Sequence, residues 1–279
     1  MKTITVTLFA IINVIALPLN AQTPLVGTGS GYSNIFSPSD QITYDVPGTG
    51  LINVNVRNGT ATKISGPWEL AAQGGMNFSL AGLGLTESAA RTSLTGTGLQ
   101  FSISNDPNSL LGELGSGLNV HYGWRAEARF DTSGVLNYQP NTIYNISFNV
   151  AGNGGLLNAI ANVTPQFTFE LIDGNGNALS SLSSGSLINV AGLLGANVGN
   201  GTVNLSYLVN DTVPSGPMGV RFTGDAIVGA SVLNLGTTFA TVTNLNITAT
   251  PVPEPGGAAL LGTVGVICLL RRRRHLGMA

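Results

Sequence analysis

The segment Tyr122-Gly-Trp-Arg-Ala-Glu-Ala-Arg-Phe-Asp131 decides the fold class of this chain. Every second residue in it is apolar: Tyr122, Trp124, Ala126, Ala128 and Phe130. From residue 125 onward, the residues at the other positions carry charges of alternating sign: Arg125, Glu127, Arg129 and Asp131. Because successive side chains of a β-strand point to opposite faces, the segment predicts a strand with one buried and one solvated face. The alternating charges can pair along and across strands.

Four more segments repeat this alternation: 144–150, 167–171, 203–209 and 245–249. Turns rich in Gly, Pro, Asn and Asp separate them, and helical periodicity is almost absent. Many short strands with regular turns are typical of an all-β domain. The sequence therefore predicts a β-sandwich or jelly roll of antiparallel strands over residues 41–250.

Some segments do not show the alternation. Residues 22–40 are rich in Gly, Ser, Thr and Pro, which predicts a flexible lead-in or, in part, an edge strand. Four further segments are rich in Leu, Gly and Ala: 82–91, 108–118, 154–163 and 187–201. Each is a long loop or a short helix at an end of the sandwich, and periodicity does not decide between the two.

The overall charge hides an acidic body between basic ends. The 279 residues have a formal net charge of −2. Lys2, four terminal arginines and Glu254 lie outside residues 22–250, which leaves 6 basic and 12 acidic residues in the body and a charge of −6. An acidic body argues against nucleic-acid binding. The single cysteine, Cys268, also lies outside, so disulfides do not stabilise the body and its core must do so.

Residues 1–21 have the features of a secretory signal peptide. Met1-Lys2 supplies a positive start, residues 4–19 are largely apolar, and Ala21 is a small residue at the expected cleavage site. We therefore expect the body to be exported and to begin near Gln22.

The C-terminal end combines three features without a gap. Val252-Pro-Glu-Pro255 is followed by fifteen uncharged, mostly apolar residues, 256–270, and then by four arginines, 271–274. A helix of that length spans about 22 Å against a bilayer core of about 30 Å, so the predicted transmembrane helix is a weak anchor. The arginines would remain cytoplasmic. The alternative, a buried C-terminal core helix, conflicts with four consecutive arginines.

This order resembles the PEP-CTERM sorting signal of Gram-negative bacteria. The matching residues are the sorting motif Val252, Pro253, Glu254 and Pro255, and the basic stop-transfer group Arg271, Arg272, Arg273 and Arg274. The resemblance implies an exosortase-type enzyme as partner, which would recognise and cleave residues 251–279 near the motif. It implies a precursor held only transiently in the inner membrane, and a mature protein at the cell surface or in an extracellular polysaccharide matrix.

Catalytic motifs are scarce. His121 is the only histidine of the body, which argues against a His/Cys metal site. Neither a nucleophile elbow nor a Gly-rich phosphate loop occurs in the sequence. His121 is either a member of a Ser-His-Asp triad or a surface histidine at the start of a strand.

Arg125, Glu127 and Arg129 are the candidate ligand-binding residues. They form either a solvated salt-bridge ladder or a polar, sugar-binding face. Glu127 and Asp131 are about 13 Å apart along a strand, which is too far for a pair of retaining glycosidase carboxylates unless the side chains lean together.

Asp173-Gly-Asn175-Gly-Asn177 matches the first half of a calcium loop. The glycine and glutamate expected next are Ala178 and Ser184, so a β-hairpin turn is the favoured interpretation. We expect no cofactor, with a structural calcium ion as the alternative.

The body loosely resembles jelly-roll carbohydrate-binding-like domains, through residues 122–127, 140–148 and 239–249. Three hypotheses follow. The first is a non-enzymatic surface or matrix protein associated with exopolysaccharide. The second is a carbohydrate-binding module with a defined glycan, which two features would favour: a pocket or groove, and exposed aromatic residues beside Arg125 and Glu127. Burial of Trp68, Tyr122, Trp124 and Tyr144, together with no binding on a glycan array, would remove it. The third is a glycoside hydrolase or lyase, which requires two carboxylates in a cleft.

Overall fold

Residues 122–129 of the alternating segment belong to β7, which begins at Asn119 and ends at Arg129. The computed structural model describes residues 22–37, 39–44, 52–80, 83–105, 119–132, 134–152, 166–182, 201–229 and 237–252. These residues form thirteen strands and no α-helix. The strands are β1 (Thr23–Val26), β2 (Asp40–Thr43), β3 (Ile52–Ser65), β4 (Trp68–Leu80), β5 (Leu83–Leu94), β6 (Gly98–Asn105), β7 (Asn119–Arg129), β8 (Thr142–Gly152), β9 (Gln166–Ile172), β10 (Ala178–Leu182), β11 (Gly201–Val209), β12 (Gly219–Gly229) and β13 (Thr237–Pro251).

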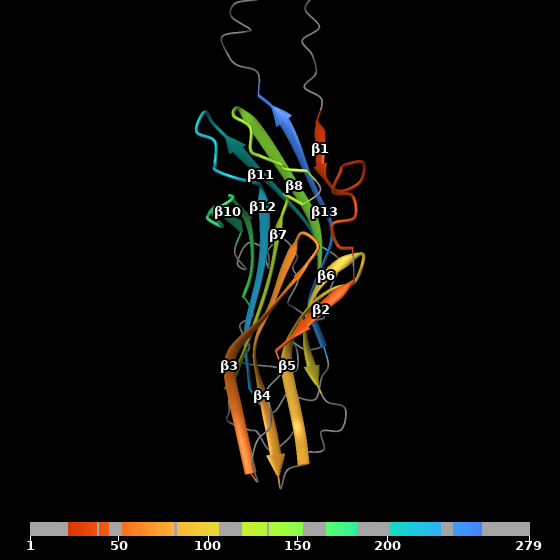
Figure 1. Cartoon of the computed structure of the whole chain (residues 1–279), viewed down its shortest axis with the longest axis vertical. Coiled ribbons are helices and arrows are strands. Elements are labelled where there is room, and N and C mark those ends of the chain that lie inside the picture. Colours follow the sequence, from red (N-terminus) through yellow and green to blue (C-terminus); the bar gives the residue numbers. More distant parts are fainter. Residues whose placement is uncertain are drawn as a thin grey trace, which may run out of the picture.

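The strands form one antiparallel sheet that curls into two layers. Its order is β10-β9-β12-β7-β4-β5-β6-β13-β8-β11, with β3 added to β4, β2 to β5 and β1 to β13 (Figure 1). Phe148 of β8 lies 4.8 Å from Phe169 of β9 and 5.3 Å from Phe222 of β12, between ring centroids. Since β8 is far from β9 and β12 in the strand order, these contacts require the sheet to fold back on itself. The predicted all-β, antiparallel class is confirmed.

Gly74 marks the corner between the layers. Residues 68–73 of β4 pair with β7, whereas residues 75–80 pair with β5. Gly74 has a φ of 81°, and a Cβ atom there would lie 1.9 Å from the carbonyl oxygen of His121. Only glycine permits both the backbone angle and this close approach.

The apolar face of β7 forms the centre of the core, as its alternation predicts. The five alternating apolar side chains, four in β7 and one just after it, are all buried: Tyr122, Trp124, Ala126, Ala128 and Phe130. The four other alternating segments are also strands, in β8, β9, β11 and β13. The charged face differs from the prediction in two ways. The strand ends before Asp131, which lies exposed in the following turn, and Glu127 is buried rather than solvated.

Residues 22–37 pack firmly against the sandwich. Strand β1 pairs with β13, and Val26 is fully buried. The Trp68 indole N–H donates a 2.6 Å hydrogen bond to the carbonyl oxygen of Ile35, and Phe36 stacks on the Trp68 ring at 5.7 Å. Of the two alternatives for residues 22–40, an edge strand is therefore present in part as β1, and apolar anchors among the small residues hold residues 22–37 against the sandwich.

The segment 82–91, for which loop and helix were the alternatives, contains neither from residue 83 onward, because β5 occupies it. The signal peptide at 1–21, the residues from Pro253 onward and the segments 108–118 and 154–163 lie outside the described residues, as does 187–201 except for Gly201, where β11 begins. Within the part of the chain that the structure describes, no helix has the length and apolarity needed to cross a membrane.

Candidate functional site

The outward residues of β4, β7, β12 and β9 form what we call the charged face. Their register places Glu69 beside Glu127, Glu127 beside Arg221, and Arg221 beside Glu170. This row joins four strands that are far apart in the sequence, so the ion pairs on it depend on the fold.

Glu127 is the centre of an ion-pair network, and its side chain is only 8% exposed. One carboxylate oxygen accepts a 2.8 Å hydrogen bond from Arg129 Nε, and the other accepts one of 2.8 Å from Arg221 Nε. Arg221 Nη1 also donates to Glu170 at 3.0 Å. Burial raises the pKa of Glu127, but the hydrogen bonds from Arg221 and Arg129 outweigh it and hold that pKa below its usual value.

The same arginines hold the turn between β9 and β10. Arg129 Nη1 donates to the carbonyl oxygens of Asp173, at 3.0 Å, and Gly174, at 2.7 Å. Arg221 Nη2 donates to the carbonyl oxygen of Gly176 at 3.0 Å. The donors of this network are therefore largely occupied by the protein itself, which makes its role structural.

The three predicted ligand-binding residues separate into two groups. Glu127 and Arg129 belong to the network and form the salt-bridge ladder. Arg125 pairs with Glu69 instead and lies at the margin of a groove. The structure thus does not bring the three together as one polar surface.

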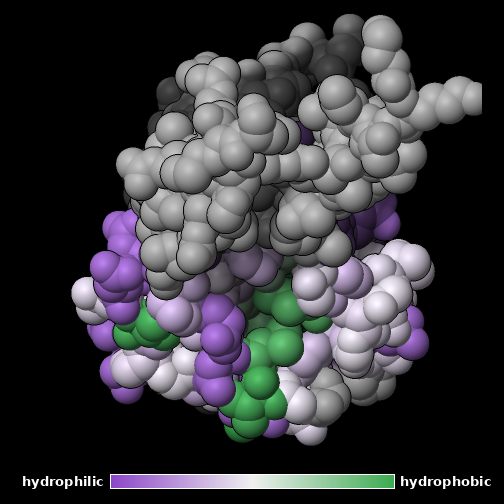
Figure 2. Space-filling view, turned by 90° about the horizontal axis from the view of Figure 1, so that it is seen from above, coloured by the Kyte–Doolittle hydropathy of each residue, from purple (hydrophilic) through white to green (hydrophobic). Residues whose placement is uncertain are grey.

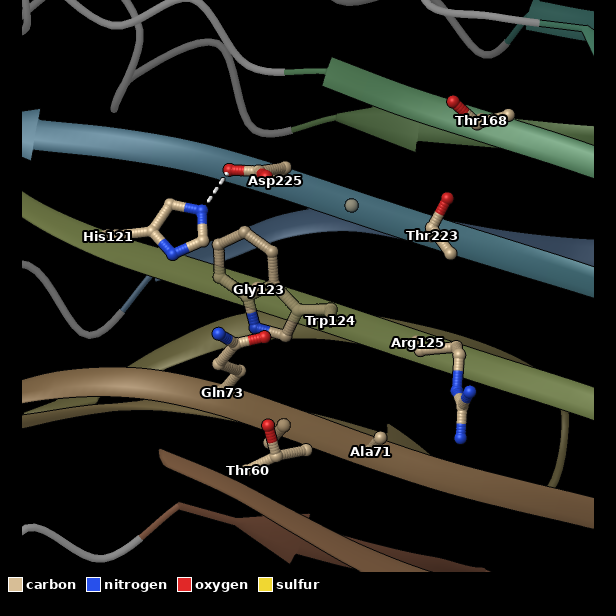
Figure 3. Close-up of a pocket in the computed structure, with 12 residues that line it drawn as sticks. Thr60, Ala71, Gln73, His121, Gly123, Trp124, Arg125, Thr168, Thr223 and Asp225 are labelled. Atoms are coloured by element: carbon tan, nitrogen blue, oxygen red, sulfur yellow. Dashed lines mark hydrogen bonds and ion pairs between the residues drawn. The ribbon is translucent and has the colours of Figure 1, made fainter. Parts of the chain in front are cut away.

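The groove has a volume of about 480 Å³ and lies on the charged face next to the network. Its main lining residues come from three neighbouring strands: Gln73 of β4, His121, Gly123 and Arg125 of β7, and Thr223 and Asp225 of β12 (Figure 3). Thr60 of β3 and Thr168 of β9 lie at its two sides. In register, Gln73 and Asp225 flank Gly123, which has no side chain to fill the space between them.

The groove carries mixed hydrogen-bonding groups. His121 Nε2 and Asp225 Oδ1 are 2.7 Å apart. Thr223 and Thr168 face each other across β12 and β9, and their hydroxyls bond to no residue that the structure describes. Arg125 Nε is buried and has no hydrogen-bond partner among the described residues. This N–H group can therefore donate to a further acceptor without losing a hydrogen bond that the described residues make.

Two catalytic arrangements can be compared with this groove. His121 and Asp225 supply two members of a triad, but the described lining contains no serine or cysteine. Asp225 is the only carboxylate among the described lining residues, whereas glycoside hydrolysis uses two. Glu127 is paired with arginines, and Asp131 lies in the turn after β7.

The aromatic residues singled out in the sequence do not form a platform. Trp68, Tyr122, Trp124 and Tyr144 are each at most 3% exposed. The burial of all four removes one of the two features expected of a carbohydrate-binding module. Sugar binding at the groove would depend on hydrogen bonds and not on stacking against these rings.

Asp173 closes the turn of the β9–β10 hairpin. Its Oδ1 accepts hydrogen bonds from the backbone N–H groups of Asn175, at 2.9 Å, and Asn177, at 2.8 Å. Its Oδ2 accepts one from Asn177 Nδ2 at 3.0 Å. Although burial raises the pKa of Asp173, these hydrogen bonds outweigh it and lower that pKa. The hairpin is the interpretation that the sequence favoured, and the carboxylate oxygens serve the turn.

Sequence reasoning missed most of the groove. His121 and Asp225 are 104 residues apart, and no local pattern pairs their strands. The one usable signal was Gly123, which interrupts the outward row of β7 between His121 and Arg125. A glycine inside a strand often marks the close approach of another group.

Comparisons with known proteins add little. No protein-family model matches the chain, and no curated protein matches it. Among solved structures, a cyclase from Fischerella sp. TAU in complex with 4-(1H-indol-3-yl)butan-2-one is 14% identical, with 77% of this chain and 86% of that one covered and a TM-score of 0.33. The enzymatically active domain of tailspike protein 4 from bacteriophage CBA120 is 12% identical, with 80% and 21% covered and a TM-score of 0.26. A carbohydrate-binding module of the β-sandwich superfamily is 9% identical, with 72% and 99% covered and a TM-score of 0.24. At these scores, the likenesses support no argument about function.

Proposed function

We propose that this chain is an exported, non-enzymatic protein of the cell surface or extracellular matrix that is processed at a PEP-CTERM signal and associates with exopolysaccharide. The observation that carries the proposal is the order of Val252-Pro-Glu-Pro255, an apolar segment and four arginines. The predicted signal peptide supports it, because sorting of this kind acts on a body that has already crossed the membrane.

The limits of the fold are compatible with processing at both ends. Strand β1 begins at Thr23, two residues after Ala21, and β13 ends at Pro251. The Val252 N–H donates a 2.7 Å hydrogen bond to the carbonyl oxygen of Asn141. Cleavage within the motif at 253–255 would therefore remove no part of the sandwich.

The two limits also lie side by side. Thr23 of β1 pairs with Ala249 of β13, so the chain enters and leaves the sandwich at the same end (Figure 1). Seen from above that end, the described surface is mostly hydrophilic or weakly polar around a narrow hydrophobic strip (Figure 2). In the proposed precursor, this end would face the membrane.

The non-enzymatic part of the proposal rests on the chemistry of the groove. Its described lining offers one carboxylate and mixed donors and acceptors, which suits the binding of hydroxyl groups better than the hydrolysis of a glycosidic bond. A carbohydrate-binding domain of jelly-roll type remains the second candidate function, favoured by the groove itself.

Localisation of internally tagged protein tests the proposal. A tag at either terminus would be removed by processing, so we place it between Thr212 and Val213, in the exposed loop between β11 and β12. The expected product lacks both ends and is found at the cell surface or in the medium. Glu254→Ala should instead accumulate in the membrane fraction, whereas Thr250→Ala should be processed normally. Wild-type protein that stays full-length in the inner membrane would exclude the proposal.

A further inference from the structure

Gly123 creates a hollow in an otherwise crowded face. Two rows away from Gly123, the residues Glu127, Arg221 and Glu170 fill the surface with long side chains. In the groove, Gly123 lies between Gln73 and Asp225. The row between the Gly123 row and the Glu127 row contains only Ala71, Arg125, Thr223 and Thr168. The lining therefore includes backbone, short side chains and the largely buried Trp124, and the charged and amide groups stand around them (Figure 3). The hollow is open to solvent, as a site for part of a polymer must be.

We propose that the groove over Gly123 binds a segment of a neutral polysaccharide through its hydroxyl groups. This inference rests on the proposed association with exopolysaccharide and names the site and the class of glycan. A sugar hydroxyl both donates and accepts, so it can satisfy the Asp225 carboxylate as a donor and the threonine hydroxyls as either partner. The lining combines these kinds of group within a small area.

The charges of the groove favour a neutral glycan over a polyuronate. Arg125 is paired with Glu69, and His121 is paired with Asp225, whose side chain is 53% exposed. No described cation in the groove is thus left with a full uncompensated charge. The body as a whole carries a charge of −6 and repels polyanions at long range.

Arg125 supplies a movable donor. Its Nε is buried without a hydrogen-bond partner among the described residues, so no hydrogen bond from them compensates the desolvation of this N–H group. A hydroxyl oxygen in the groove offers this guanidinium an acceptor while the Glu69 pair is retained through Nη2. Ligand binding would then supply the hydrogen-bond acceptor that the Arg125 Nε–H group lacks in the free protein.

Gly123→Val tests the groove without disturbing the core. The atoms nearest to a Cβ at Gly123 are Cβ and Oε1 of Gln73, at 3.3 and 3.4 Å, so a side chain there requires a shift of a few tenths of an ångström between β7 and β4. Valine also suits a strand better than glycine. The variant should therefore still fold, which its melting curve checks, while its side chain fills the floor of the groove. Gly31→Val is the matched control, because a Cβ at Gly31 meets nothing within 4 Å.

The probes are neutral hexose oligosaccharides (glucans, mannans and galactans) and hexuronate oligosaccharides, immobilised on an array. The full-length chain is used in a detergent without a sugar head group, since such a head group would compete. We expect binding to at least one neutral glycan and none to the uronates. Titration with that glycan should give a Kd raised about tenfold or more by Gly123→Val, about threefold by Thr223→Val, and less than twofold by Gly31→Val.

Absence of binding to every neutral glycan, stronger binding to the uronates, or an unchanged Kd in a folded Gly123→Val variant would each overturn the inference. The test of glycan binding at the groove can fail independently of the test of sorting and processing. Gly123→Val should still be sorted to the cell surface, because the groove plays no part in processing at residues 252–255. A failed groove with normal sorting would leave the proposed localisation standing.

Discussion

The two outward faces of the sandwich use the same alternation but different chemistry. The charged face on β4, β7, β12 and β9 is held by ion pairs around a buried Glu127. The outward residues of β8, β11 and β13, which we call the amide face, are mostly Asn, Ser and Thr: Asn145, Ser147, Asn149, Thr202, Asn204, Ser206, Asn246 and Thr248. Here exposed side chains bond in neutral pairs, such as Ser206 Oγ to Asn145 Oδ1 at 2.7 Å.

The difference shows where polar groups matter for stability. A buried carboxylate must be paired, so removal of one partner leaves uncompensated charge. An exposed amide or hydroxyl that loses its partner bonds to water instead. The charged face should therefore respond strongly to mutation and to pH, and the amide face should respond weakly to both.

The largest effect is expected where the charged face ends, at Gly74. Gly74→Ala would place a Cβ within 1.9 Å of the His121 carbonyl oxygen at a φ of 81°. We expect a loss of more than about 3 kcal/mol in the free energy of unfolding, measured by urea denaturation. Gly29→Ala has a similar φ of 85° but meets nothing within 4 Å, and should lose only about 1 kcal/mol. Equal losses in the two variants would show that strand β4 does not turn this corner as described.

The next effect compares the faces directly. Glu127→Ala removes the shared partner of Arg129 and Arg221, and should cost about 3 kcal/mol of unfolding free energy. Asn149→Ala on the amide face removes the acceptor of one exposed hydrogen bond, from Thr202, and should cost about 0.5 kcal/mol. A cost below about 1 kcal/mol for Glu127→Ala would mean that the network behaves like an ordinary surface ion pair.

The response to acid separates the faces in a different way. Because the pKa of Glu127 is lowered in the folded state, the carboxylate form stabilises the fold above its ordinary pKa of 4.5. That contribution is lost as the pH falls below 4.5 and through the lowered value. The melting temperature of the wild type should therefore fall between pH 5 and pH 3 by more than that of Glu127→Gln, about 1.4 kcal/mol being lost for each unit of pKa difference. Asn149→Ala should follow the wild-type curve, and a Glu127→Gln curve parallel to the wild type would contradict the assignment.

How much of this was visible in the sequence depends on how local the pattern is. The inner face of β7 was predicted correctly, because Tyr122, Trp124 and Phe130 follow the period of a single strand. The burial of Glu127 was not, because its cover, Arg221, is 94 residues away. Strand β5 escaped notice because Ala89 and Ala90 are both buried, which removes the alternation that marks a strand.

The groove was hidden for a related reason. Its polar residues are ordinary surface types in any one strand, and only the register of β4, β7, β12 and β9 brings them together. Long-range pairings of this kind are not encoded in a local period. The interruption by Gly123 was the only local trace of the hollow.

The smallest effect concerns one exposed pair on each face, an ion pair on the charged face and a neutral hydrogen bond on the amide face. Arg125→Ala breaks the exposed pair with Glu69, and Ser206→Ala breaks the hydrogen bond to Asn145; each should cost about 0.5 kcal/mol or less at low salt. Salt separates them, because the Debye length shrinks from about 10 Å at 0.1 M to about 3 Å at 1 M. The cost of Arg125→Ala should vanish in 1 M NaCl, whereas that of Ser206→Ala should persist. If both costs were independent of salt, the Arg125–Glu69 contact would contribute through packing of the arginine stem, and the charged face would owe its stability to the Glu127 network alone.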